Sequence, residues 1–459
     1  MEQGLQFDVE LISRYDRSGP RYTSYPTAPN FTESFKEADY WQQIELSNNR
    51  GGPLSLYFHI PFCDTVCFYC ACNKIITKNR RHADTYLKSL FKEVAHQAEL
   101  FDSSRIVDQL HWGGGTPTFL STEQMRQLMA VTRQHFNLHT DDSGEYSIEI
   151  DPREANAKII AELRELGFNR ISLGVQDFDS AVQKAVNRIQ SEEETFAVLD
   201  AARSEGFKSV SMDLIYGLPL QTVASFEKTL DKVLAVEPDR LSIFNYAHMP
   251  ALFKVQRQIN EPDLPSAASK LEILQMTTQR LISAGYVYVG MDHYAKPSDD
   301  LVIAQQRGEL YRNFQGYSTH ADCDLIGFGV SSIGRVADAY VQNAKDLEFY
   351  QTIVEKGSLP IQKGYVLSLD DQIRRMVINE LICHFEVDFT AVNKRYAIDS
   401  HQYFSKEIEQ LKTMAVDGLL ECRQEGVRVK PIGRMLIRNI CMVFDAHLAQ
   451  KNTQYSKVI

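Results

Sequence analysis

Residues 63–72 read CDTVCFYCAC, and they directly follow the apolar run PLSLYFHIPF at residues 53–62. Four cysteines within ten residues are a density typical of a metal-binding loop. A 4Fe–4S cluster is held by cysteine thiolates, and three cysteines in one tight loop can bind three of its irons. The fourth iron is then open to a reactive ligand, so the spacing favours an open iron–sulfur cluster.

Zinc is the main alternative for this loop. Structural zinc sites usually combine two pairs of Cys or His ligands with a longer spacer between the pairs. Here all four cysteines stand together, and Cys70 and Cys72 are too close in sequence to share a four-thiolate cage comfortably. Ligand type and geometry therefore favour the open cluster over zinc. A disulfide framework is less favoured still, because the chain is long and its other four cysteines are scattered.

The bulk composition limits the class of protein. With 459 residues, 44% hydrophobic and 24% charged, the chain is long enough for two or three globular domains. Residues 1–17 carry acidic side chains and no apolar core, so they do not resemble a signal peptide. No window approaches ~18 uninterrupted apolar residues, which argues against a membrane span. Scattered thiols without an export signal predict a cytoplasmic protein.

The net charge of −11 disfavours nucleic acid as the main partner, because binding to phosphates needs a dense basic surface. An acidic small molecule stays compatible with this charge if a few Arg or Lys side chains converge locally.

Short apolar runs alternate with amphipathic helical patterns from residue 53 to about 295. This alternation predicts parallel strands covered by helices, in a partial or complete (β/α) barrel of the α/β class. In such barrels the active site lies at the carboxyl ends of the strands, which is where the cysteine loop stands. The predicted strands are residues 54–60, 106–112, 146–150, 170–175, 209–216, 240–246 and 286–291.

The two ends of the chain differ from this pattern. Residues 18–31 contain three prolines and several aromatic residues, which predicts an irregular N-terminal arm or a lid rather than a helix. Residues 368–450 read as helices with one hairpin, and we expect a mostly helical domain that caps the barrel. A winged-helix DNA-binding domain is rejected, because no helix carries a basic stripe. The predicted domains are residues 1–50, 51–365 and 366–459.

Polar residues follow several of the predicted strands. The segment HWGGGTPT at residues 111–118 lets backbone amides approach a ligand closely, although a tight strand-to-helix turn would use the same glycines. Glu149 and Asp151 point to one face of their strand. Asp151 precedes a proline and is best explained as a helix cap, whereas Glu149 suits ribose hydroxyls or an ammonium group.

The cysteine loop resembles the C-x3-C-x2-C signature of the radical S-adenosylmethionine enzymes. The additional Cys72, the preceding YFHIPFC and the arm segment GPRYTSYPT narrow the resemblance to the oxygen-independent coproporphyrinogen III oxidases. The resemblance covers the chain from about Gly19 through RNICMVFDAHL near its end, with no departure at a motif position. It implies one 4Fe–4S cluster bound by Cys63, Cys67 and Cys70.

The resemblance also implies roles for other residues. Tyr57 and His59 lie before the cysteines, Tyr69 takes the aromatic position near adenine, and Gln315 and Phe314 lie near the cofactors. The implied catalytic residues are Tyr57, His59, Cys72 and Gln315. The implied ligands of two S-adenosylmethionine molecules are Tyr57, Tyr69, Gly114, Gly115, Thr116, Glu149, Gln176, Arg188, Asp213, Ala247 and Ile333. For Cys72 the family pattern gives the only account, and Arg21 and Arg312 are guesses for the substrate carboxylates.

The activity implied is oxidative decarboxylation of two propionates of coproporphyrinogen III to vinyl groups by a 5′-deoxyadenosyl radical. The expected partners are this substrate, an unidentified electron donor and an unidentified acceptor, with no nucleic acid and no membrane, for a monomer. One alternative is a related haem chaperone without oxidase activity, which Cys72 and the GPRYTSYPT arm disfavour. A second is a non-enzymatic iron–sulfur or zinc scaffold.

Overall fold

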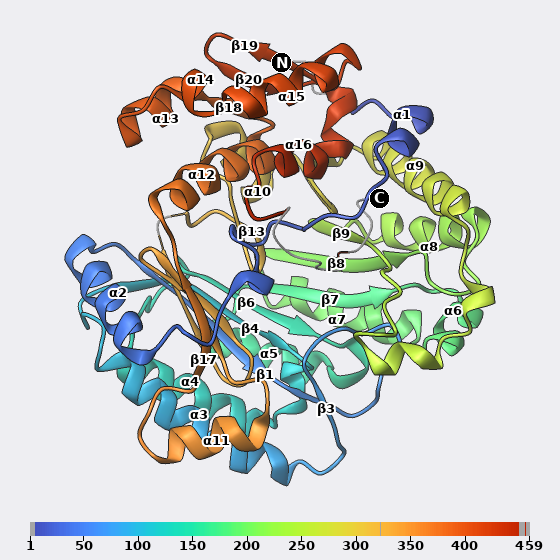
Figure 1. The fold of residues 1–459 in the computed structure, drawn as a ribbon. Helices are drawn as coiled ribbons and strands as arrows, with labels where there is room; N and C mark the ends of the chain where they lie inside the picture. The colour runs from blue at the N-terminus through green and yellow to red at the C-terminus, as the bar shows by residue number, and fades with distance from the viewer. Residues whose placement is uncertain (1–4, 322, 449–454, 456–459) are drawn as a thin grey trace. The chain divides into compact units, whose positions relative to one another are not determined.

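The computed structural model describes residues 5–321, 323–448 and 455, and the chain divides into two units. The sheet unit consists of Phe31–Ser266 and Asp322–Val366. The terminal unit consists of Met1–Asn30, Ala267–Ala321 and Leu367–Ile459. Each unit thus combines segments that are distant in the sequence (Figure 1).

Parallel strands form the centre of the sheet unit, in the order β14-β1-β4-β6-β7-β8-β9 (Figure 1). Most side chains of β1 and β4 are buried, as expected for parallel strands whose two faces are both covered. The strands are β1 (Leu54–Ile60), β4 (Ile106–Gly114), β6 (Glu145–Ile150), β7 (Arg170–Gln176), β8 (Ser209–Tyr216), β9 (Arg240–Asn245) and β14 (Asp324–Phe328).

All seven predicted strands are present, but the seventh is not part of the parallel run. Strand β10 (Val287–Gly290) pairs antiparallel with β11 (His293–Ala295) in the terminal unit. Two residues connect them, and so short a connection cannot make the crossover that parallel strands require. The parallel partner on the other side of β1 is β14, which is not among the seven predicted strands. The parallel strands form a partial barrel.

Helices cover this sheet because their apolar side chains recur at helical spacing. In α3 the buried Tyr86, Leu87, Leu90 and Val94 form one face, and α3 packs beside α4 and α11 (Figure 1). Side-chain caps begin several of the helices. The helices of the sheet unit are α2 (Glu37–Arg50), α3 (Arg81–Ala98), α4 (Thr122–His135), α5 (Ala157–Glu165), α6 (Ser180–Ala185), α7 (Glu192–Ser204), α8 (Val223–Ala235) and α11 (Leu347–Glu355).

Antiparallel strands extend the sheet beyond β14, in the order β15-β16-β17. They are β15 (Ile333–Val336), β16 (Ala339–Asn343) and β17 (Ile361–Val366). The remaining short elements of the unit are β2 (Phe62–Cys63), β3 (Ile75–Ile76), β5 (Asn137–Leu138), η2 (Pro117–Phe119), η3 (Pro152–Glu154), η4 (Lys254–Gln258) and η5 (Glu261–Asp263).

The terminal unit is mostly helical after residue 366, as predicted, and its hairpin lies where the sequence places it. The segment 18–31 contains only one short 3₁₀ helix, so the predicted absence of a continuous helix is confirmed. The elements are α1 (Val9–Arg14), η1 (Ala28–Asn30), α9 (Ala267–Ser283), α10 (Asp300–Arg307), β12 (Tyr311–Asn313), β13 (Gly316–Ser318), α12 (Leu369–His384), β18 (Glu386–Asp388), α13 (Phe389–Tyr396), α14 (Ser400–Tyr403), α15 (Ser405–Val416), β19 (Leu420–Arg423), β20 (Gly426–Val429), η6 (Pro431–Leu436) and α16 (Ile437–Val443).

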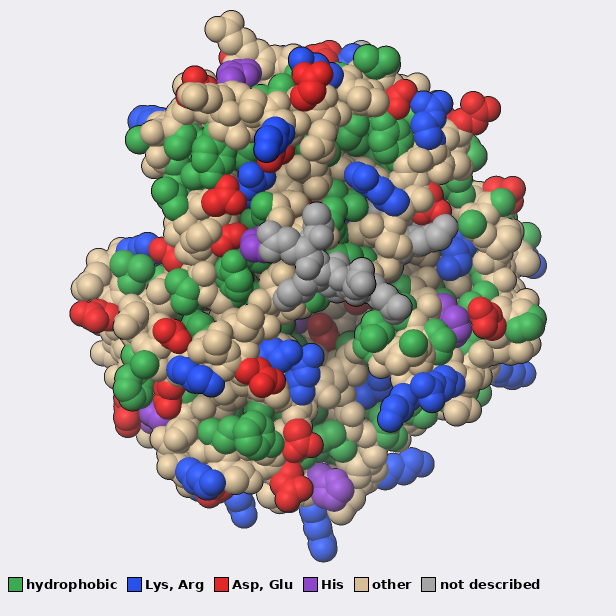
Figure 2. All heavy atoms as spheres, viewed as in Figure 1, with side chains coloured by type: hydrophobic (Ala, Val, Ile, Leu, Met, Phe, Trp, Pro, Cys, Tyr) green, Lys and Arg blue, Asp and Glu red, His purple; other side chains and the backbone are tan. Residues whose placement is uncertain are grey.

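The two units group the chain differently from the predicted domain boundaries, since residues 267–321 belong with the two ends of the chain. That domains end at residues 50 and 365 stays a prediction. Basic and acidic side chains are interspersed on the face seen in Figure 2. Among the described residues, no helix combines the length and the apolar character that crossing a membrane requires.

Candidate active site

The cysteine loop follows β1 and brings three thiols together. Thr116 donates a hydrogen bond to Cys63 Sγ at 3.5 Å. Desolvation, together with the nearby Cys70 and Cys67, raises the pKa of Cys63 to about 11. Metal binding deprotonates cysteine thiols and holds them as thiolates. The proximity of Cys63, Cys67 and Cys70 therefore fits a metal cluster as the group that the loop binds.

Cys72 lies in the same loop but in a different setting. Its side chain is hydrogen-bonded to that of Cys70, and this bond lowers the pKa of Cys70 and raises that of Cys72. Cys72 is exposed, whereas Cys67 is buried. Cys72 also interacts electrostatically with Tyr57 and Glu149, so it lies near both. Cys72 is therefore close to the predicted ligand residues without being one of the three converging thiols.

Two arginines reach the sulfur of Cys67. Arg188 donates to Cys67 Sγ at 3.6 Å and Arg153 donates at 3.8 Å. Both guanidinium groups also bind Asp151 Oδ2, at 2.9 Å from Arg188 and 2.6 Å from Arg153. Desolvation raises the pKa of Asp151, but these two cations outweigh it and the pKa is lowered overall. The predicted cap by Asp151 is confirmed, because its side chain accepts from Arg153 N.

Close approach of neighbouring atoms requires the glycines at the end of β4 and directly after it. A Cβ on Gly113 would lie 2.9 Å from the Glu149 carboxyl carbon, and one on Gly114 would lie 2.7 Å from the His59 ring. A Cβ on Gly115 would lie 2.7 Å from the carbonyl oxygen of Phe62. The glycine run is therefore a packing requirement of the site, and its amides donate to Glu149 and to the carbonyl oxygen of Ile60.

Glu149, near the end of β6, makes several polar contacts at these strand ends. Its carboxylate accepts from Gly114 N at 3.1 Å and lies 3.4 Å from His111 Nε2. Desolvation raises the pKa of Glu149, but the hydrogen bond and charge of His111 and the Gly114 amide hold it below its usual value. Glu149 is thus an ionised, partly exposed acceptor, suited to hydroxyl or ammonium groups.

Tyr57 and His59 lie on the same face of β1, close to Glu149 and its neighbour His111. The Tyr57 hydroxyl is 3.1 Å from His59 Nδ1, and the Tyr57 ring stacks on His111. His59 Nε2 is 2.9 Å from the carbonyl oxygen of Asn73, just after the cysteines. Burial lowers the pKa of His59, so its ring is neutral near pH 7. His59 therefore joins β1 to the cysteine loop by hydrogen bonds.

Gln176 ends β7, and Asp213 lies within β8. Gln176 has a left-handed backbone, with φ of 69°, at a bulge between β7 and β8. A side chain on Gly174 would meet both Gln176 Nε2 and Arg188 Nη2 at 3.0 Å, which places these two residues together. Desolvation raises the pKa of Asp213 to about 6, despite hydrogen bonds from Ser172 and Ser242. Strained backbone and a perturbed carboxylate at strand ends are common in functional sites.

Tyr69 and Ala247 are brought together by a residue that the sequence analysis did not single out. Gln256 is buried and donates from Nε2 to the carbonyl oxygens of Tyr69, at 3.0 Å, and Ala247, at 3.3 Å. Tyr69 and its neighbour Phe68 also pack against the buried cluster that contains Val182 and Leu218. The structure thus fixes the cysteine loop against the segment after β9.

The other predicted residues are divided between the units. Ile333 begins β15 in the sheet unit, whereas Phe314 and Gln315 lie in the terminal unit. Arg21 forms an ion pair with Asp292 at 2.6 Å within the terminal unit. In the same unit Arg312 is buried over the Tyr317 ring, and its Nε and Nη1 atoms have no hydrogen-bond partner among the described residues.

Arg153 and Gln256 are the functional candidates that sequence reasoning missed. Arg153 stands two residues after Asp151 at the end of β6, so the rule that sites lie at strand ends could have found it. Gln256 lies in the irregular segment after β9, and nothing in its sequence context indicates that it contacts Tyr69.

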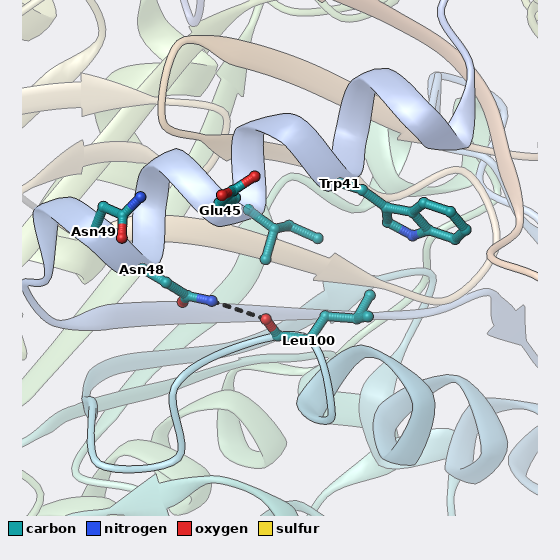
Figure 3. A pocket seen from close by; sticks show the side chains of 6 residues that line it. Trp41, Glu45, Asn48, Asn49 and Leu100 are labelled. Carbon is teal, nitrogen blue, oxygen red and sulfur yellow. Dashed lines mark hydrogen bonds between the residues drawn. The ribbon is translucent and has the colours of Figure 1, made fainter.

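A separate surface pocket of about 260 Å³ lies beside α2. Figure 3 shows Trp41, Glu45, Asn48 and Asn49 on this helix, with Asn48 Nδ2 donating to the carbonyl oxygen of Leu100 at 2.9 Å. None of the six lining residues is a predicted site residue.

Comparison with known proteins decides the family. The chain is 52% identical to the oxygen-independent coproporphyrinogen III oxidase of Pseudomonas aeruginosa, over 99% of both chains. It is 49% identical to that of Escherichia coli, over 100% of this chain and 99% of the relative. The chain belongs to the oxygen-independent coproporphyrinogen III oxidases. The Radical SAM superfamily model matches residues 57–233, and the HemN C-terminal domain model matches residues 367–436.

Membership of the coproporphyrinogen oxidase family agrees with the fold. A solved structure, coproporphyrinogen III oxidase (HemN) from Escherichia coli, described as a Radical SAM enzyme, has a TM-score of 0.93 to this chain at 47% identity. It covers 97% of this chain and 100% of its own. The radical S-adenosylmethionine fold predicted from the cysteine loop is therefore confirmed, as is the prediction of the oxidase family over the haem chaperone.

Proposed function

We propose that the protein converts two propionate side chains of coproporphyrinogen III to vinyl groups, giving protoporphyrinogen IX without oxygen. The observation that carries this proposal is the convergence of Cys63, Cys67 and Cys70 beside Thr116 and Glu149, in a chain of the oxidase family. When bound, the 4Fe–4S cluster and S-adenosylmethionine supply the 5′-deoxyadenosyl radical that removes a hydrogen from the propionate.

The chain's own residues bind and orient S-adenosylmethionine. Gly114, Gly115 and Thr116 lie at the strand end beside the cysteines, and we propose them as contacts of its amino and carboxylate groups. The ionised Glu149 suits its ribose hydroxyls. Tyr69, held through Gln256, offers a ring for stacking against adenine.

Gln176, Arg188, Asp213 and Ala247 are proposed to hold a second S-adenosylmethionine. The proposal is supported by the adjacency of Gln176 and Arg188 and by the buried Nε of Arg188, which has no hydrogen-bond partner among the described residues. Ile333 stays a predicted contact.

Tyr57 and His59 are proposed to position the reacting groups and exclude water, since both are linked to the cysteine loop. Cys72 is proposed to act near them because it lies close to Tyr57 and Glu149. Gln315 stays a predicted catalytic residue.

Substrate binding and cellular context are also proposals. Coproporphyrinogen III carries four carboxylates, and the Nε and Nη1 groups of Arg312, which have no partner within the described part of the chain, are suited to one of them. An electron donor and an acceptor are required as further partners, and we expect neither nucleic acid nor membrane to be a partner. All eight cysteines are free, which supports the proposal of a reducing, cytoplasmic location. That the enzyme is a monomer stays a prediction.

The decisive experiment is anaerobic reconstitution of the full chain with iron and sulfide, followed by reduction in the presence of S-adenosylmethionine and coproporphyrinogen III. We expect 5′-deoxyadenosine and two molecules of carbon dioxide for each substrate converted. The variant Cys63→Ala is the matched control and should give neither product. A protein that binds one zinc and forms no 5′-deoxyadenosine would contradict the proposal.

A further inference from the structure

Cys67 differs from the other two predicted cluster ligands in its surroundings. It is 8% exposed, and the two guanidinium groups of Arg153 and Arg188 donate to its sulfur. Cys63 receives only the Thr116 hydroxyl among the side chains whose contacts with it are described. Cys70 has the single ammonium group of Lys74 beside it. Cys67 is therefore the ligand with two guanidinium groups at its sulfur.

The charges around Asp151 do not cancel. Arg153 and Arg188 both bind the same Asp151 oxygen, so one carboxylate faces two guanidinium groups. Asp151 and Arg188 have side chains that are 7% and 8% exposed, so water compensates little of the excess. The trio carries one net positive charge, and the Cys67 sulfur is an acceptor that both arginines share. A negatively charged cluster at this sulfur would balance the trio.

A fixed positive charge affects the two redox states of a cluster unequally. Reduction adds one negative charge, and the potential of an iron–sulfur cluster depends on net charge and on hydrogen bonds to its sulfurs. N–H groups that donate to a ligand thiolate stabilise the more negative, reduced state. The same groups therefore make the cluster easier to reduce by an external one-electron donor.

We propose that Arg153, held by Asp151, raises the reduction potential of the cluster through its contact with Cys67. The inference depends on the proposed function only in requiring a 4Fe–4S cluster on Cys63, Cys67 and Cys70. Arg153 acts through a ligand sulfur and touches no reacting atom, so it is a tuning residue. One electron passes from the donor to the oxidised cluster, and no bond in Arg153 forms or breaks.

The test is a potentiometric titration of the reconstituted full chain without S-adenosylmethionine, followed by electron paramagnetic resonance of the reduced cluster. In Arg153→Met we expect a lower potential, seen as an about tenfold smaller reduced-to-oxidised ratio at a fixed potential, equivalent to about 59 mV for one electron. In Asp151→Asn we expect a shift in the opposite direction, because the trio gains net positive charge. Lys92→Met removes one charge from an exposed pair with Glu355 and should leave the potential unchanged.

The opposite signs separate tuning from a structural role, since general loosening of the loop would move both variants the same way. Shifts of one sign in both variants, or an unchanged potential in Arg153→Met, would overturn the inference. If the Arg153→Met variant binds no cluster, the direction of the potential shift in Asp151→Asn decides alone whether the inference holds. Iron and sulfide analysis separates the two proposals: a wild-type protein without a cluster refutes both, whereas a cluster with unchanged potentials refutes only the tuning.

Discussion

Asp213 illustrates how the setting of one residue defines its chemistry. It lies within β8, and its carboxylate accepts a hydrogen bond from Ser172 at 2.9 Å and interacts with the like charge of Glu149 and the opposite charge of His111. Desolvation dominates these effects and raises its pKa to about 6. Its negative charge is therefore present at pH 8 and largely lost at pH 5.

We predict that the affinity for S-adenosylmethionine rises about tenfold between pH 5 and pH 8, because the ionised Asp213 attracts the cationic cofactor and the protonated form does not. The measurement is equilibrium binding to the cluster-loaded protein. Asp213→Asn should flatten the profile at low affinity, whereas Asp200→Asn, on the exposed face of α7, should not change it. A steep profile in Asp213→Asn would assign the effect to another group.

At the scale of the element, packing at the strand ends requires small residues and buried groups with complete hydrogen bonding. The end of β4 approaches Glu149 and His59 so closely that only glycine fits. On the other side of β1, helix α3 presents Glu93 to β14 and β16. There it accepts from Gly329 N at 2.8 Å, Asn343 Nδ2 at 2.7 Å and Tyr350 Oη at 2.5 Å.

We predict that Gly113→Ala weakens S-adenosylmethionine binding about tenfold while the fold is retained, because the new methyl group displaces only the end of the Glu149 side chain. Binding and circular dichroism measure the two effects. Adding Glu149→Asp shortens the side chain that carries the carboxylate. It should therefore relieve the clash and restore part of the affinity. Unchanged binding in the single variant would exclude Glu149 as a ligand.

The raised pKa of Glu93 predicts that the free energy of unfolding depends on pH. Burial raises its pKa to about 7, against partly compensating hydrogen bonds, so its proton is bound more tightly in the folded than in the unfolded state. Its stabilising contribution is then present below about pH 4.5 and is lost as the pH rises through 7, by about 3 kcal/mol in total.

Glu93→Gln should therefore match the wild type at pH 5 and exceed it at pH 8, measured by urea unfolding across this range. The exposed Glu355→Gln is the control and should follow the wild type. Identical pH profiles for Glu93→Gln and the wild type would contradict the prediction.

At the scale of the molecule, a buried ion pair joins three segments of the sheet unit. Arg105 precedes β4 and its side chain is 4% exposed. It donates to Asp324 at the start of β14, at 3.1 Å, and to Ser47 in α2, at 2.7 Å. The pair thus connects parts of the chain that are more than 200 residues apart in sequence.

We predict that Arg105→Met lowers the free energy of unfolding of the sheet unit by about 3–5 kcal/mol, because it leaves the Asp324 carboxylate without its cation. Urea unfolding measures the loss. Arg50→Met removes an exposed pair with Asp338 and should cost less than about 1 kcal/mol. Equal losses in both variants would contradict the argument from burial.

The sequence alone determined the cysteine loop, the alternation of strands and helices, and the polar residues at strand ends, because these depend on local spacing and composition. It did not determine that β14 pairs with β1, or that β10 turns back on β11, since strand pairing is set by contacts distant in the sequence. Only the tertiary structure placed Arg153 and Arg188 together on Cys67. Their approach depends on where β6 and the segment after β7 end in space, and no local pattern records it.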